Sequence, residues 1–238
     1  MRQVPPGQPP PIGIVGDGRL ARHFQHYFQL LGLSICRWCR RETTVDPPEA
    51  LASCQTVLLL IRDDAIVPFV EQWPEMKRQR LVHCSGSLVT PVAVCMHPLM
   101  AFGEQLYDLD TYAGVVFAVD AGTTLPELLP GVPNQFFMVS AADRPYYHAL
   151  CVLAGNVSTM LWAKLFEELE QRFGVNAEAA FPFLKPITAN LVDDPHRALT
   201  GPFSRRDTDT IRTNLDALEH DPFRAVYAAV AGMYGYSA

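Results

Sequence analysis

Ten residues near the start of the chain, 12–21, constrain its fold more than any other segment. The apolar run at residues 12–15 breaks into Gly16-x-Gly18-x-x-Ala21 and continues at once in a helical pattern. Gly16 would permit a tight turn, Gly18 would let backbone approach a pyrophosphate, and Ala21 would let helix and strand pack closely. The new helix would offer unpaired N–H groups and its positive dipole end to the anion. The pattern predicts a dinucleotide-binding unit; the alternative is a turn whose glycines serve backbone geometry alone.

The residues that follow complete this unit. Apolar residues recur at helical spacing from Ala21 to Leu31, and Gly32 is a typical helix stop. Residues 33–38 then alternate apolar and polar side chains, as a second strand would. The whole segment has roughly the 30 residues that a strand–helix–strand unit needs.

The end of the second strand indicates which nucleotide the unit would prefer. In NAD-binding units an acidic residue there accepts from the ribose hydroxyls, but this chain has Cys39-Arg40-Arg41 and no carboxylate until Glu42. Two guanidinium groups at this place favour the 2′-phosphate of NADP, because arginine pairs with phosphate through charge-assisted hydrogen bonds. The alternative is a solvated basic turn.

Asp17 stands between the two glycines, where a carboxylate would repel a pyrophosphate. We expect its side chain to face solvent or to pair with Arg19 or Arg22. The expected NADP contacts are Gly16, Asp17, Gly18, Arg19, Leu20, Arg40, Arg41, Ile61 and Arg62.

Composition excludes several classes of protein. The 238 residues are 49% apolar and 18% charged, as in an ordinary globular protein, and no uninterrupted apolar run reaches the roughly 18 residues of a membrane span. A net charge of −6 argues against nucleic acid or anionic membrane as partners. Residues 1–11 are rich in proline and lack a secretory apolar region, so we expect a flexible lead-in and a cytoplasmic protein.

The six cysteines include one pair, Cys36 and Cys39, at the C-x-x-C spacing of redox and zinc sites. On a strand these two side chains would face opposite sides, and no second close pair completes four ligands. We therefore expect buried, reduced thiols and no metal site.

The rest of the chain divides into two kinds of pattern. Apolar strand patterns recur up to residue 139, and Asp63 or Asp64 is placed to cap the helix that follows residue 62. From Ala141 onward only helical patterns occur, over residues 141–173, from Asn176, over 207–219 and over 222–234. The expected fold class is α/β, with a Rossmann dinucleotide-binding domain at residues 12–140 and an all-α domain at residues 141–238.

Five segments together resemble a known superfamily, that of 6-phosphogluconate and 3-hydroxyisobutyrate dehydrogenases and pyrroline-5-carboxylate reductases. The chain is most similar to bacterial Rossmann-like proteins whose helical C-terminal half is a domain of unknown function. The resemblance covers residues 12–230 and implies an NADP-type cofactor and a homodimer formed through the helical domains, without implying a particular reaction. The matching segments are Gly16-x-Gly18-Arg19-Leu20-Ala21, Arg62-Asp63-Asp64-Ala65-Ile66, His83-Cys84-Ser85-Gly86-Ser87, His97-Pro98-Leu99-Met100-x-Phe102 and Leu199-Thr200-Gly201-Pro202-x-x-Arg205-x-Asp207.

Candidate catalytic residues follow the predicted strands, since ligands of such sheets lie beyond the carboxyl ends of the strands. Ser85 and Ser87 could hydrogen-bond the nicotinamide ribose or a substrate carboxylate. His97 could donate a proton near neutral pH. An equally good interpretation of His97 is a local hydrogen bond that shapes the turn before Pro98.

The helical domain departs from the family pattern at one position. Related hydroxyacid dehydrogenases place a catalytic lysine four residues before an asparagine; Asn156 matches that asparagine, but Val152 occupies the lysine position and Lys164 lies two turns further on. Asn156 is therefore either a substrate ligand or a packing amide. Arg205 is a candidate ligand for an anionic substrate, although the helix start at Asp207 explains this polar segment equally well.

These residues predict an NADP(H)-dependent oxidoreductase that reduces a small carbonyl or imine substrate at an interdomain cleft, and Arg205 would suit an anionic one. The missing lysine keeps a second hypothesis open, a non-catalytic NADP sensor or dimeric interaction protein.

Overall fold

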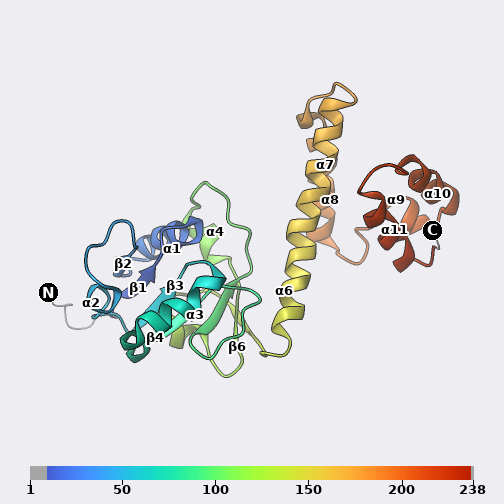
Figure 1. The fold of residues 1–238 in the computed structure, drawn as a ribbon. Helices are drawn as coiled ribbons and strands as arrows, with labels where there is room; N and C mark the ends of the chain where they lie inside the picture. Colours follow the sequence, from blue (N-terminus) through green and yellow to red (C-terminus); the bar gives the residue numbers. More distant parts are fainter. Residues whose placement is uncertain (1–9, 237–238) are drawn as a thin grey trace. The chain divides into compact units, whose positions relative to one another are not determined.

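The structure, a computed structural model, describes residues 10–236. The chain divides into two compact units, residues 1–160 and 161–238. Every strand of the described residues lies in the first unit, and the second unit is helical (Figure 1). The lead-in expected over residues 1–11 lies outside the described residues except for Pro10 and Pro11.

A seven-stranded sheet with the order β2-β1-β3-β4-β5-β6-β7 forms the first unit. Strands β1 to β5 run parallel, β6 is antiparallel to β5, and β7 is parallel to β6. The carboxyl ends of β1 to β5 therefore meet at one edge of the sheet. The strands are β1 (Ile12–Val15), β2 (Ile35–Trp38), β3 (Thr56–Leu59), β4 (Arg80–His83), β5 (Val94–Pro98), β6 (Phe117–Asp120) and β7 (Phe136–Val139).

Helices α1 (Arg19–Leu30) and α3 (Asp63–Gln72) cover opposite faces of this sheet. Phe24 and Phe28 of α1 are buried in one cluster with Leu58, while Ile66 of α3 is buried in another with Leu59. Leu58 and Leu59 are neighbours in β3, so their side chains point to opposite faces. This burial on both faces explains why the central strands are continuous apolar runs.

Short helices connect these elements, and most of them were not predicted. α2 (Pro47–Ala50) is the exception, since Pro47 and Pro48 followed by Glu49-Ala50-Leu51 predict a short helix; η1 (Pro74–Arg78), α4 (Leu109–Ala113) and α5 (Leu125–Leu128) were not predicted. A helix of one turn is too short to show hydrophobic periodicity, so its capping residues identify it better. Thr124 and Glu127 form a capping box at α5, a signal that is visible in the sequence.

The capping prediction for α3 is wrong. The helix begins at Asp63 itself, with Arg62 at the cap position and no side-chain cap. The Asp63 carboxylate instead accepts from the Ser85 hydroxyl, and Asp64 accepts two hydrogen bonds from Arg62. Asp63 and Asp64 thus bind the Ser85 hydroxyl and the Arg62 guanidinium instead of the backbone amides that a helix cap would bind.

One continuous helix of 28 residues, Arg144–Gln171, contains the boundary between the two units. It consists of α6 (Arg144–Val152), a π-helical segment η2 (Leu153–Val157) and α7 (Ser158–Gln171). Its length and composition would suffice to cross a membrane, and its most apolar 18-residue stretch is not buried inside the chain.

The second unit contains α7 and the helices that follow it. Trp162 and Phe166 of α7 contact Phe183 and Phe181 of α8. Ile211 and Leu215 are buried in a separate cluster. The remaining elements are η3 (Ala177–Ala180), α8 (Phe181–Asp193), α9 (Gly201–Arg205), α10 (Thr208–Ala217) and α11 (Arg224–Met233).

The expected fold class, an α/β domain followed by helices, is confirmed. The last strand ends at Val139 and the first long helix starts at Arg144, whereas the compact units divide after Met160. The difference arises because the first turns of the long helix contact the sheet. Arg144 forms an ion pair with Asp120 at the end of β6.

Candidate functional site

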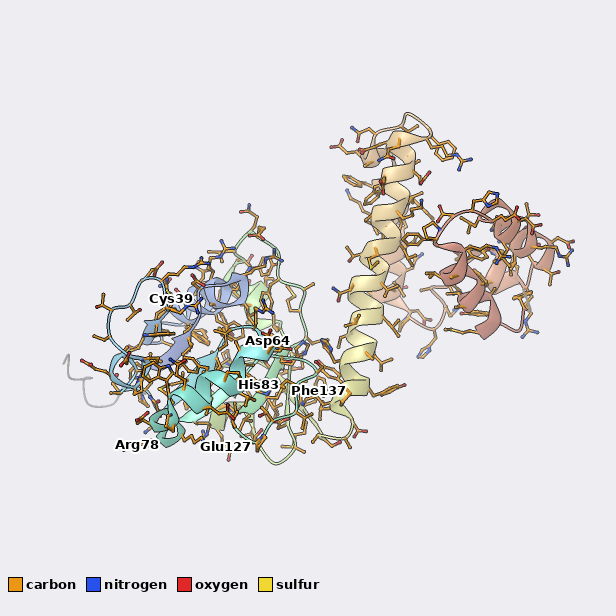
Figure 2. All side chains as sticks on the ribbon, viewed as in Figure 1. Cys39, Asp64, Arg78, His83, Glu127 and Phe137 are labelled. Carbon is orange, nitrogen blue, oxygen red and sulfur yellow. The ribbon has the colours of Figure 1, made fainter. Side chains whose placement is uncertain are left out.

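A cavity of about 1010 Å³ lies along the carboxyl edge of the sheet. This is at the upper end of the volumes that cofactor sites have. Cys39 and Asp64 lie toward this side of the unit, while Arg78 and Glu127 lie toward the opposite edge (Figure 2). The lining residues follow β2, β1, β3 and β4, which is also the order of these strands across the sheet. The cavity therefore crosses four neighbouring strands.

Every NADP contact expected from the sequence lines this cavity, as does the candidate catalytic residue Ser85. Their role in binding a nucleotide stays a prediction. These residues are Gly16, Asp17, Gly18, Arg19, Leu20, Arg40, Arg41, Ile61, Arg62 and Ser85.

The turn after β1 has the geometry that the glycine pattern predicts. Gly16 has φ +120°, and a Cβ there would overlap the carbonyl oxygen of Leu60, so no other residue fits without strain. A Cβ at Gly18 would meet no atom within 4 Å, which leaves the backbone open toward the cavity. Helix α1 has no side-chain cap and no acidic residue in its first turn. Its first amides and its positive dipole end are thus available to an anion.

Asp17 is exposed to solvent, one of the two expected arrangements; the other, a pair with Arg19 or Arg22, is not formed within residues 10–236. Both guanidinium groups bind the Glu104 carboxylate, in the loop between β5 and α4, with Arg22 at 2.9 Å. The sequence could not show this pairing, because Glu104 lies more than 80 residues away from both arginines.

Two arginines lie exposed at the β2 end of the cavity. Neither Arg40 nor Arg41 forms an ion pair within residues 10–236, whereas Glu42 is paired with Arg37. The first carboxylate after β2 is thus neutralised, and two guanidinium groups face the cavity. Thr43 and Thr44 line the same end and add hydroxyl groups.

At the β4 end of the cavity the Ser85 hydroxyl is held by two partners. It donates to Asp63 Oδ2 at 2.5 Å and accepts from the Leu88 amide at 3.1 Å. This fixes the loop after β4 against the start of α3. Ser87 is exposed and does not line the cavity.

Next to Ser85 lies a cluster of His97, Tyr147 and His148, which we call the imidazole cluster. His97 Nδ1 lies 2.9 Å from the Tyr147 hydroxyl, and its ring centroid lies 5.8 Å from that of His148. His97 ends β5, whereas Tyr147 and His148 belong to α6. Only His97 was expected from the sequence, because helical spacing gives no sign of which turn lies over the sheet edge.

Arg144, in the first turn of α6, is fully buried and ties this helix to the sheet. Its Nη1 donates to Cys95 Sγ at 2.8 Å, and its Nη2 lies 2.8 Å from Asp120 Oδ1 without hydrogen-bond alignment. Asp120 also accepts from the Cys95 amide at 2.7 Å. These contacts position the first turns of α6, and hence Tyr147 and His148, over the ends of the strands.

Two histidines near this helix start are held neutral. Burial lowers the pKa of His83 to about 4, and its Nδ1 has no hydrogen-bond partner. Burial, and then the charges of His148 and Arg144, lower the pKa of His97 to about 4. At neutral pH His97 therefore lacks the proton that a catalytic acid must give.

These shifts predict acid sensitivity. An unfolded histidine binds a proton near its ordinary pKa of 6.5, but folded His83 and His97 do so only near 4. Their contribution to stability is complete above about pH 6.5 and is lost as the pH falls toward about 4. We expect the free energy of unfolding to drop by about 1–2 kcal/mol per histidine between pH 7 and pH 5. Urea unfolding followed by circular dichroism at both pH values measures this loss.

The variant His97→Gln should remove the share of the loss that comes from His97. His220→Gln, at an exposed position of the second unit, should leave the pH dependence unchanged. Equal stability of the unmodified protein at pH 7 and pH 5 would contradict the assignment.

The remaining candidates lie apart from this cavity or in the other unit. Asn156 is exposed within the π-helical segment η2, a kind of segment that is frequent at functional sites. Arg205 is exposed at the end of α9 in the second unit. Lys164 pairs with Glu168 at 2.6 Å and Asp221 at 2.8 Å, and hydrogen bonds to these two carboxylates raise its pKa. Val152, at the family's lysine position, is at the border of exposure.

The six cysteines are free thiols, three of them buried (Cys39, Cys54 and Cys95) and three partly exposed. Within residues 10–236 no group of three or more histidine, cysteine or acidic side chains is arranged to hold a metal ion. Cys36 and Cys39 lie at the end of β2, and Cys39 lines the cavity.

Comparisons with known proteins agree with this architecture. Residues 117–233, from β6 through α11, match a family described as a domain of unknown function, DUF2520. No curated protein matches the chain.

Several solved structures share the fold over most of their length. A Bacteroides fragilis protein described as a candidate NADP oxidoreductase has a TM-score of 0.72 at 18% identity, over 94% of this chain and 97% of that chain. A reductive aminase from Aspergillus terreus, in complex with NADPH and ethyl levulinate, has a TM-score of 0.61 at 16% identity, over 96% and 88%. Pyrroline carboxylate reductase from Plasmodium falciparum, with NADP bound, has a TM-score of 0.59 at 11% identity, over 95% and 96%. At these identities the likeness establishes the fold.

Proposed function

We propose that this Rossmann-fold protein with a DUF2520 domain is an NADPH-dependent oxidoreductase that reduces a small carbonyl or imine compound. The observation that carries the proposal is one cavity lined both by the uncapped start of α1 and by two arginines that have no ion-pair partner among residues 10–236. The similar structures named above include two with NADP or NADPH bound, which supports the same cofactor.

The chain offers a distinct group to each part of the cofactor. The amides at the start of α1, opened by Gly18, would hold the pyrophosphate. Arg40 and Arg41 would hold the 2′-phosphate at the β2 end. The nicotinamide would then occupy the β4 end, where Ser85 and Asp63 form their hydrogen bond. Asp17 remains exposed at the turn, where solvent screens its charge.

When bound, reduced nicotinamide supplies a hydride, and the protein must hold the acceptor and provide a proton. Ser85, Ser87 and His97 follow the strands at this edge and are proposed to help hold the acceptor, since His97 is neutral at pH 7 and has no proton to give. Asn156 and Arg205 remain proposed substrate ligands, with Arg205 suited to an anionic substrate.

Titration with NADPH, followed by nicotinamide fluorescence, tests the cofactor. We expect saturable binding that is tighter than the binding of NADH. A panel of keto acids, ketones with amines and cyclic imines, followed by nicotinamide absorbance, then tests turnover. Failure to bind either nucleotide by calorimetry, on folded protein, would contradict the proposal.

A second candidate is a protein that binds NADP without turnover. It is favoured by Val152 at the position of the family's lysine, and by Lys164, whose two carboxylate partners keep it from acting as a proton donor. Tight NADPH binding with no oxidation across the whole panel would select this candidate.

We also propose that the helical part forms a homodimer in the cytoplasm. The Arg144–Gln171 helix leaves Leu153 and Met160 more than half exposed, and α8 does the same with Phe183 and Val192. Exposed apolar surface of this extent typically marks an interface. A second copy of the helical part would cover it without inserting the helix into a membrane.

A further inference from the structure

His148 is in direct contact with the loop that ends the cavity at β4. A Cβ added at Gly86 would overlap the His148 ring, so the imidazole lies against the backbone of this glycine. Gly86 follows Ser85, which lines the cavity and binds Asp63. His148, on the first turns of α6, therefore contacts the residue that directly follows Ser85 at the β4 end of the cavity.

Several titratable groups surround this imidazole. His97 faces it from β5 at 5.8 Å between ring centroids. Tyr147 lies beside it on α6 and is hydrogen-bonded to His97, and Arg144 is buried one turn earlier on the same helix. Around the rest of the cluster, Asp63 at the start of α3 acts by its charge on His97, the Cys95 thiol binds Arg144, and Cys151 of α6 lies near Tyr147.

Within the imidazole cluster His148 is the group suited to carry a proton. Burial and the nearby charge of Arg144 lower the pKa of His97, and its Nδ1 is engaged with Tyr147. Two imidazoles this close do not both hold a charge, because each protonation disfavours the other. His148 is partly exposed, and its ring lies against the Gly86 backbone at the β4 end of the cavity.

We propose that His148 is the catalytic acid of this site, an assignment that rests on the function proposed above. During reduction the substrate carbon gains a hydride, so that the nicotinamide is oxidised by two electrons. The electron pair of the broken C=O or C=N π bond takes the proton of the His148 imidazolium, and the neutral imidazole regains a proton from solvent. His97 and Tyr147, which are hydrogen-bonded to each other, act as positioning residues. They fix the part of the cluster against which the His148 ring packs.

The proposal can be tested by binding, without knowledge of the substrate. The oxidised nicotinamide ring carries a positive charge that the reduced ring lacks. Protonated His148 should therefore disfavour NADP⁺ relative to NADPH. We expect the ratio Kd(NADP⁺)/Kd(NADPH) to rise about threefold to tenfold as the pH falls from about 8.5 to about 5.5. The 2′-phosphate is common to both nucleotides, so its own titration cancels in the ratio.

Calorimetric titrations of both nucleotides at several pH values provide the ratio. In His148→Gln the ratio should become independent of pH while both nucleotides still bind, and His148→Asn should repeat this result if the glutamine variant folds poorly. His220→Gln, at an exposed histidine of the second unit, should keep the full pH dependence.

Each outcome has a separate meaning. A ratio that does not change with pH in the unmodified protein, or that changes equally in His148→Gln, overturns the role of His148 while NADP binding stands. Loss of the pH dependence in His97→Gln but not in His148→Gln also overturns it, because the proton would then belong to His97. Absence of binding by the unmodified protein refutes the proposed function instead.

Discussion

Replacing Arg144 with leucine should lower the free energy of unfolding of the strand-containing unit by about 3 kcal/mol. The guanidinium is fully buried and bridges Cys95 and Asp120 at 2.8 Å each. Without it the Asp120 carboxylate, which is one-third exposed, loses its only ion-pair partner among the described residues. An unpaired charge of this kind costs more than the cavity left by the missing atoms. Urea unfolding at pH 7 measures the change.

Two further variants separate charge from packing. Arg144→Leu combined with Asp120→Asn should recover at least about 1 kcal/mol relative to Arg144→Leu alone, because the uncompensated charge is gone. Arg22→Ala removes an arginine from an exposed ion pair with Glu104 and should change stability by less than about 1 kcal/mol. A cost for Arg144→Leu as small as that of Arg22→Ala would show that the buried ion pair does not hold α6 to the sheet.

The double variant Arg40→Ala and Arg41→Ala should weaken NADPH binding roughly 30- to 150-fold while changing NADH affinity little. Charge-assisted hydrogen bonds from two exposed arginines to the 2′-phosphate would together contribute about 2–3 kcal/mol. NADH lacks this phosphate. Binding of both nucleotides, measured by fluorescence titration at constant ionic strength, gives the two affinities.

A matched control removes the same two charges elsewhere. Lys77→Ala with Arg78→Ala alters exposed residues of η1, and Arg78 lies toward the opposite edge of the unit (Figure 2). This control should leave both affinities within about twofold, since solvent screens distant surface charges. Equal losses of NADPH and NADH affinity in the arginine variant would show that Arg40 and Arg41 attract both nucleotides by charge alone. That result would contradict the proposed contact with the 2′-phosphate and the preference for NADP.

The first strand–helix–strand unit could be predicted in detail because its determinants are local. Gly16 must take a positive φ and lies against Leu60, and α1 shows its buried face as Phe24 and Phe28 at helical spacing. The residues that line the cavity could also be predicted, because residues that follow parallel strands lie at the same edge of the sheet. Short helices such as α4 and α5 could not be predicted from hydrophobic periodicity, because a single helical turn is too short to show a repeat.

Side-chain partners distant in the chain could not be predicted from the sequence. Asp63 was expected to cap α3, but it binds Ser85 from the loop after β4. Asp17 was expected to face solvent or to pair with Arg19 or Arg22; it is exposed, and both arginines bind Glu104. In both cases a group nearby in the sequence was a chemically suitable partner. In the folded chain a residue from a loop distant in the sequence forms the contact instead.

The order of residues along the chain was enough to establish a nucleotide-type turn, the basic end of β2 and the change from strands to helices after residue 139. These features depend on backbone geometry within about 30 residues. The tertiary structure decided which imidazole is held neutral and which is accessible. That distinction arises from burial and from charges on separate elements, because β5 contributes His97, α6 contributes His148, and the buried Arg144 joins that helix to the sheet.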